Sequence, residues 1–204
     1  MFTENEISAL IIDPEIEKKT QELKEEFIEK EAPYLEISDH DFLSLILLTP
    51  SVGIAMANNS VSLMEEMALN KKARKYSKGG YFLKQDPVVS AMGYLIKHYD
   101  EWADIFYAHL KVVINVLIDK EELMKSKIAS PDTTDAQFCV EIMKSPFILV
   151  RAISSFLSNA EDEDLSAERK IAQIEYDRII DILEKIGLLD IPLVAQHISK
   201  FVIK

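Results

Sequence analysis

The sequence predicts an all-α protein: a single domain, residues 1–204, of about eight helices packed around a long central helix at about 87–118. Three observations favour this class. The chain has only five glycines, which is few for a turn-rich β architecture. Asp, Ser or Thr directly precedes proline at positions 13, 49, 86, 130 and 145. Such a capping oxygen before a proline is typical of a helix start, and apolar residues follow each pair at helical spacing.

The expected helices lie at about 14–31, 38–48, 50–76, 87–118, 132–144, 146–157, 166–186 and 191–202. The first has a narrow apolar stripe of Ile16, Leu23 and Phe27 on a charged background, so we expect it on the outside of the molecule. Pro33 ends it. No Gly/Ser-rich linker divides the chain, and this favours one domain.

The fourth expected helix, 87–118, has the longest apolar pattern, and we expect it to be the central one. Its core stripe is Val88, Met92, Leu95, Tyr99, Trp102, Phe106, Leu110, Val113 and Leu117. The same helix contains "KHYDEWADIFYAH", the stretch richest in reactive side chains. His98 and His109 fall on one shoulder of the core stripe, and Glu101 lies one step further towards solvent.

These two histidines are not expected to share a metal ion, because eleven residues of helix separate them by roughly 16 Å. His98 with Glu101 is the only pair at a ligand-like helical spacing, and one helix supplies too few ligands. Neither Glu-x-x-His nor His-Glu-x-x-His occurs in the chain. We therefore expect boundary histidines, with no metal and no cofactor. A site would require convergence with another helix, through His40, Glu66 or His197 for example.

A polar run in the third expected helix offers a second candidate. Asn59, Ser62, Glu66 and Asn70 recur at helical spacing and could line a polar pocket. Two other interpretations stay open. Ser62 and Glu65 have the spacing of a capping box that restarts the helix after a break near Asn59, or the stripe simply faces water.

Three further features have a structural and a functional interpretation. Arg151 interrupts an apolar helix, so it either has a buried carboxylate partner or extends to the surface. Cys139 is expected to be a small buried apolar residue rather than a nucleophile. The basic cluster "NKKARKYSK", residues 70–78, complements a helix C-terminus, and the alternative is binding of a phosphate-bearing ligand or an acidic partner.

Charge and cysteine content narrow the function classes. Asp and Glu total 35 against 23 Lys and Arg, and the net charge of −12 argues against nucleic acid as a ligand. The single cysteine fits a reducing compartment, and the N-terminus lacks the basic start of a signal peptide. The most apolar stretch, 42–57, is shorter than the roughly twenty residues that span a membrane. We expect a cytoplasmic protein without membrane contact.

These observations favour a non-catalytic, partner-binding module of the adaptor, immunity-like or chaperone-like kind, acting through an acidic, partly apolar surface. The alternative is a small-molecule or metal-dependent protein with its site between the third and fourth helices. No catalytic spacing is complete, so an enzyme is not expected, and a homodimer is compatible with the sequence. The candidate ligand-binding residues are His98, Glu101, Asn59, Glu66, His109 and Arg151.

Overall fold

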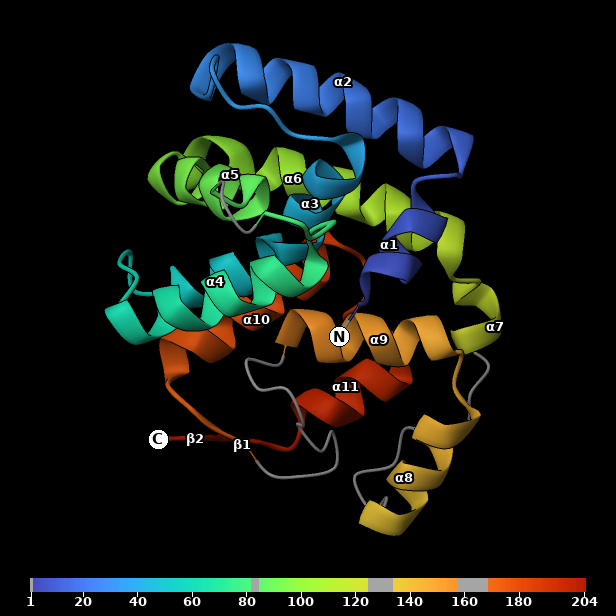
Figure 1. Ribbon diagram of the computed structural model, residues 1–204. Coiled ribbons are helices and arrows are strands. Elements are labelled where there is room, and N and C mark those ends of the chain that lie inside the picture. The colour runs from blue at the N-terminus through green and yellow to red at the C-terminus, as the bar shows by residue number, and fades with distance from the viewer. Residues whose placement is uncertain (1, 82–84, 125–133, 158–168) are drawn as a thin grey trace.

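The computed structural model describes residues 2–81, 85–124, 134–157 and 169–204 (Figure 1). These residues form eleven helices and two short strands, so the predicted all-α class is confirmed, with more helices than the eight expected. The helices are α1 (Glu4–Leu10), α2 (Pro14–Glu31), α3 (Asp39–Ala55), α4 (Leu63–Tyr76), α5 (Pro87–Lys97), α6 (Tyr99–Leu117), α7 (Lys120–Met124), α8 (Asp135–Lys144), α9 (Phe147–Leu157), α10 (Gln173–Lys185) and α11 (Pro192–Ile198). The strands are β1 (Arg169–Ile171) and β2 (Phe201–Ile203).

The central element is α3, in which every residue from 40 to 55 is buried. It packs against α2, α4, α5, α6, α9 and α10. Figure 1 shows α2 outermost beyond α5 and α6, with α9, α10 and α11 on the other side of the molecule. A helix that is apolar nearly all round has no face suited to water, which explains this position. The expectation that 87–118 is the central helix is therefore wrong.

A break at Thr49–Pro50 was expected, yet α3 continues through both residues. The Thr49 hydroxyl donates to the carbonyl oxygen of Leu45 at 3.1 Å instead of capping a new helix. Proline inside a helix removes one backbone hydrogen bond and costs about 3 kcal/mol. Burial of apolar side chains on all sides of α3 outweighs that cost, so the local signal for a helix start is overridden.

The expected third helix, 50–76, is in fact the end of α3 and the whole of α4, separated by a turn. Asn59 in that turn has a φ of 61°, in the left-handed region that asparagine tolerates better than most residues. Ser62 and Glu65 form a capping box at the start of α4. This confirms the capping-box interpretation of these two residues.

The expected helix 87–118 is divided at His98, which ends α5 and begins α6 with φ −117° and ψ 29°. Its predicted core stripe is nevertheless buried from Val88 to Val113, and Leu117 is partly buried. The centre of the Phe106 ring lies 5.5 Å from the ring centre of Phe27 in α2 and 5.7 Å from that of Phe42 in α3. These contacts join three helices in one aromatic cluster.

The other predicted helix starts have mixed outcomes. Asp13 and Asp86 cap α2 and α5, and Ser145 lies two residues before α9. Ser130 and the acidic run 161–164 lie outside the described residues. The bounds of α2 match the prediction, and its stripe of Ile16, Leu23 and Phe27 is buried.

The C-terminal region differs from the two helices expected at 166–186 and 191–202. Residues 169–171 and 201–203 form a parallel pair of strands, with Ile171 opposite Ile203. Ile171 of β1 and Phe201 of β2 are buried. The helical spacing of the sequence did not indicate these strands. In the part of the chain that the structure describes, no helix has the length and apolar character needed to cross a membrane.

Candidate functional site

A cluster of one histidine and two carboxylates forms where the end of α2 meets the junction of α5 and α6. His98 Nδ1 lies 3.2 Å from Glu31 Oε2 and 3.9 Å from Glu101 Oε1. The three groups bring their possible ligand atoms within 4.8 Å of one another. The side chains of Glu31, His98 and Glu101 are 10%, 38% and 73% exposed. We call this group the Glu31–His98–Glu101 cluster.

The position of Glu31 is fixed by Trp102. The indole N–H of Trp102 donates to Glu31 Oε1 at 2.8 Å, and the other carboxylate oxygen faces His98. The ammonium of Lys30 lies over the indole, 5.6 Å from the centre of the ring. Glu31 is the last residue of α2, and His98 stands at the break between α5 and α6. Both residues are thus placed by helix ends.

Sequence reasoning identified His98 and Glu101 but missed Glu31. The α2 and α6 helices run antiparallel, so that Glu31 meets His98 at one end while Thr20 meets His109 further along. Eleven residues separate the two histidines, and eleven also separate Glu31 from Thr20. No local pattern reveals this pairing, because it depends on how two distant helices pack.

The other histidines lie in separate environments. Thr20 Oγ1 is 3.1 Å from Nε2 of buried His109. Burial lowers the pKa of His109 to about 4, and the charge of Lys19 adds to this effect. The ring of His197 packs edge-on against Phe201, with ring centres 5.3 Å apart. His109 and His197 therefore lie in surroundings other than those of His98.

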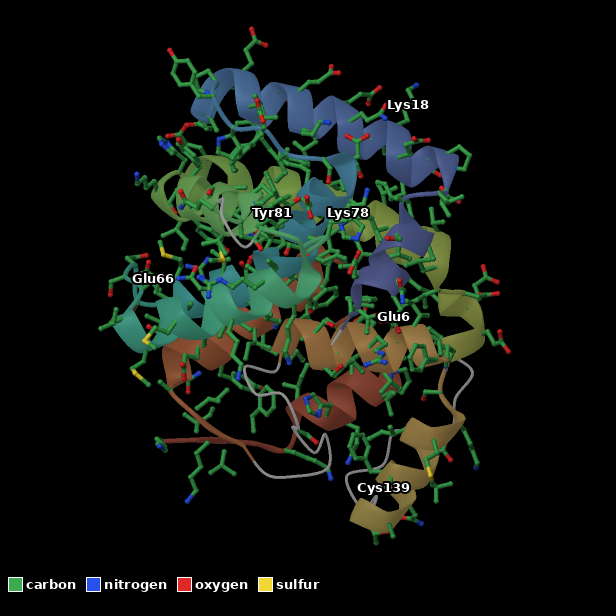
Figure 2. The ribbon with its side chains drawn as sticks, in the orientation of Figure 1. Glu6, Lys18, Glu66, Lys78, Tyr81 and Cys139 are labelled. Atoms are coloured by element: carbon green, nitrogen blue, oxygen red, sulfur yellow. The ribbon has the colours of Figure 1, made fainter. Side chains whose placement is uncertain are left out.

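His40 belongs to a buried network centred on Asp41. Asp41 accepts hydrogen bonds from the Ser38 hydroxyl at 2.9 Å, the Lys78 backbone N–H at 2.8 Å and the Tyr81 hydroxyl at 2.9 Å. Figure 2 shows Lys78 and Tyr81 close together beside the start of α3. Burial favours the neutral acid, but these hydrogen bonds and that of His40 outweigh it and lower the pKa of Asp41. The ionised carboxylate holds Lys78 and Tyr81 against α3, which is a structural role.

A hollow of about 590 Å³ lies between α4 and α5. Glu66 and Asn70, both from the predicted polar run, line it, whereas Asn59 stands exposed in the turn before α4. His98 and Glu101 do not line it. The full lining is Tyr34, Leu35, Glu66, Asn70, Gln85, Val89, Ser90, Met92, Gly93, Tyr94, Ile96 and Lys97.

Two further hollows adjoin the first. One of about 430 Å³ shares Asn70 with it, and one of about 520 Å³ shares Gln85 and Val89 with it. Arg74 lines both of these smaller hollows. The three neighbouring hollows share lining residues along α4 and α5, and we call the surface that bears them the α4–α5 surface.

The outer face of α4 borders this surface and has two halves. Leu63, Met64 and Met67 are exposed in the N-terminal half, and the basic side chains of the C-terminal half include exposed Lys71, Arg74 and Lys75. The spacing of these residues places them on one side of the helix. Figure 2 shows Glu66 at this edge of the molecule, away from Lys18 on α2.

Arg151 is partly buried, with 31% of its side chain exposed, and it has a carboxylate partner. Its Nε lies 3.2 Å from Glu6 Oε1, and its guanidinium lies over the ring of Phe147 at 4.6 Å. This contact joins α1 to α9. Cys139 is partly buried on α8 rather than fully buried as expected. Arg151 is therefore placed by an ion pair between helices, away from the Glu31–His98–Glu101 cluster.

No family model, no curated protein and no solved structure matches the chain. Two features of the structure bear on function: the α4–α5 surface and the Glu31–His98–Glu101 cluster.

Proposed function

We propose that this protein is a non-catalytic, partner-binding protein of the cytoplasm that holds an acidic, partly apolar segment of another protein on its α4–α5 surface. The observation that carries the proposal is the combination of three neighbouring hollows with an adjoining helix face that is apolar in one half and basic in the other. The single cysteine, Cys139, is in keeping with a reducing compartment.

The apolar half supports recognition of a protein rather than of a small ion. Met64 and Met67 present flexible, polarisable side chains that adapt to the shape of a partner. Tyr34, at the rim of the first hollow, is 96% exposed and offers an aromatic anchor. With 14 residues, α4 is about 21 Å long, enough to lie beside four turns of a partner helix.

The basic half supports an acidic partner. The chain as a whole carries a net charge of −12, so most of its surface repels acidic proteins. Lys71, Arg74 and Lys75 gather positive charge at one end of α4, where it also complements the helix dipole. A partner steered to this end would be oriented along α4, with its apolar side chains towards the methionines.

Site-specific crosslinking tests the proposal. A photoreactive amino acid replaces Met67 in cells that make the protein, and Lys18 on α2 serves as the control position. We expect a crosslinked protein at position 67 and none at position 18, with the joined segment rich in Asp and Glu. The purified partner should then bind with an affinity that falls as salt rises.

A pair of matched charge reversals decides the role of the basic half. Arg74→Glu should weaken binding of the purified partner at least tenfold, whereas Lys18→Glu should leave it unchanged. Equal affinities of the partner for Arg74→Glu and Lys18→Glu would exclude the α4–α5 surface as the binding site. If wild type self-associates and Arg74→Glu does not, the surface binds a second copy of the chain. If the surface binds anionic vesicles and no partner protein, its ligand is lipid. Either result would overturn the proposal.

A further inference from the structure

We infer that Glu31, His98 and Glu101 bind one divalent transition-metal ion of the Zn²⁺ type. This inference is independent of the proposed partner surface. It uses one imidazole nitrogen and two carboxylate oxygens from three separate places in the chain: the end of α2, the α5–α6 junction and the first turn of α6.

The distances between the three groups suit a common ion. Zinc bonds to histidine nitrogen and carboxylate oxygen are about 2.0–2.2 Å long, which places tetrahedral ligand atoms about 3.4 Å apart. The observed separations of His98 Nδ1 are 3.2 Å from Glu31 Oε2 and 3.9 Å from Glu101 Oε1. Glu101 is largely exposed, so a small side-chain rotation brings its oxygen into place without moving the backbone.

The surroundings of Glu31 resemble an outer coordination shell. Its side chain is nine-tenths buried, and the Trp102 indole holds Oε1 by a 2.8 Å hydrogen bond. The remaining oxygen, Oε2, therefore faces His98 in a fixed direction. Hydrogen bonds of this kind orient metal ligands and reduce the cost of ordering them when the ion binds.

The donor set selects between classes of cation. Imidazole suits Zn²⁺ and other transition metals, whereas Mg²⁺ and Ca²⁺ prefer oxygen ligands. A divalent ion also neutralises the two carboxylates that face His98. Three protein ligands leave a coordination position open, which in zinc proteins is occupied by water or by a substrate.

The sequence led us to expect no metal, because His98 and Glu101 alone are too few ligands and a site would need a residue from another helix. The structure supplies such a residue in Glu31 of α2, in place of His40, Glu66 or His197. The competing interpretation is a purely structural contact, in which His98 pairs with the two carboxylates and no ion binds. The two interpretations differ in what they predict for titration with a metal salt.

Calorimetric titration of the tag-free protein with ZnCl₂ at pH 7.5 provides the test. We expect one Zn²⁺ per chain and, because Trp102 is the only tryptophan and is bonded to Glu31, a change in tryptophan fluorescence with the same midpoint. MgCl₂ in tenfold excess should not displace the zinc. Co²⁺ bound in place of zinc should give visible absorption bands.

Matched variants assign the ligands. His98→Gln and Glu101→Gln should each weaken Zn²⁺ binding at least tenfold, while Asp100→Asn, a change at an exposed neighbour on α6, should not alter it. Glu101 is exposed, so Glu101→Gln should keep its fold and its unfolding temperature without metal, which separates ligand loss from misfolding. Three results would each overturn the inference. They are a wild type that does not bind one Zn²⁺ per chain, an unchanged Zn²⁺ affinity in both ligand variants, and displacement of Zn²⁺ by an equal concentration of Mg²⁺.

Discussion

His109 Nε2 lies 3.1 Å from the hydroxyl oxygen of Thr20, and both side chains are buried where α2 packs on α6. Burial, with a contribution from the charge of Lys19, lowers the pKa of His109 from 6.5 to about 4. The ring is therefore neutral in the folded protein at neutral pH. Glu31 and His98 form the corresponding contact at the end of α2, so a polar pair lies at each of two places along this helix interface.

The first prediction concerns stability against pH. Between pH 6.5 and about 4 the unfolded chain binds a proton at His109 that the folded chain does not. The contribution of His109 is thus fully present above pH 6.5 and is lost as the pH falls towards 4, by up to about 3 kcal/mol. Urea unfolding at several pH values in this range measures the loss.

The control for this prediction is His109→Gln. Other groups titrate in the same range, and the raised pKa of His40 acts in the opposite sense, with stability lost as the pH rises. These contributions are common to both proteins. The difference in slope between wild type and His109→Gln isolates His109, and identical slopes would contradict the prediction.

The second prediction compares two helical glycines. A Cβ at Gly53 in α3 would lie 2.3 Å from the Tyr107 hydroxyl and 2.4 Å from the Tyr99 hydroxyl, which are themselves hydrogen-bonded at 2.6 Å. Gly53→Ala should therefore destabilise the fold by about 1–3 kcal/mol through overpacking. Gly93 in α5 has no atom within 4 Å of such a Cβ, so Gly93→Ala should stabilise by about 0.5–1 kcal/mol.

Thermal and denaturant unfolding of the two glycine variants give the comparison directly. Opposite signs are expected from the same chemical change. A gain in stability for Gly53→Ala would mean that the two tyrosines move apart at little cost.

The third prediction concerns the aromatic cluster. Phe106 is fully buried against Phe27 and Phe42, so Phe106→Ala should lower the free energy of unfolding by about 3–5 kcal/mol. Ile105, the preceding residue, is exposed. Ile105→Ala should therefore change the free energy of unfolding by less than about 1 kcal/mol. Denaturant unfolding of both variants measures the two changes. A loss of unfolding free energy below about 1 kcal/mol for Phe106→Ala would show that α6 is not part of the core.

The fourth prediction concerns the Asp41 network. Asp41→Ala removes the acceptor for the Lys78 backbone N–H and the Tyr81 hydroxyl, and should cost about 1–3 kcal/mol because partly buried donors lose their partner at a buried position. Asp100→Ala, at an exposed position on α6, is the control and should be nearly neutral. Equal unfolding midpoints would show that residues 77–81 do not depend on Asp41.

The parts of the fold that follow from short stretches of sequence were predictable. Asp13 and Asp86 cap helices because their carboxylates need only backbone N–H groups two and three residues away. Thr49–Pro50 has the same local pattern but fails to start a helix, since burial of α3 is decided by the helices packed around it and not by its neighbours in sequence. Burial therefore outweighed a correct local rule.

The candidate site was also predictable only in part. Helical spacing brought His98 and Glu101 together and indicated Glu66 and Asn70 as neighbours, and the structure brings each pair into one cluster or hollow. Glu31 could not be found, because its approach to His98 depends on the antiparallel packing of α2 on α6. The only signal in the sequence is a carboxylate at the end of an otherwise regular surface helix, which is common on helices of many kinds.

The complete burial of α3 also governs how the protein opens. A helix without a solvent face gains its stability from the elements around it, so its amide protons exchange with water only when most of the domain unfolds. Slow exchange in α3 is then a gauge of the stability of the whole molecule. By mass action, an ion held between α2 and α6 or a partner held on α4 would slow exchange in α3 without touching it. The innermost helix thus reports on ligands that bind only at the surface.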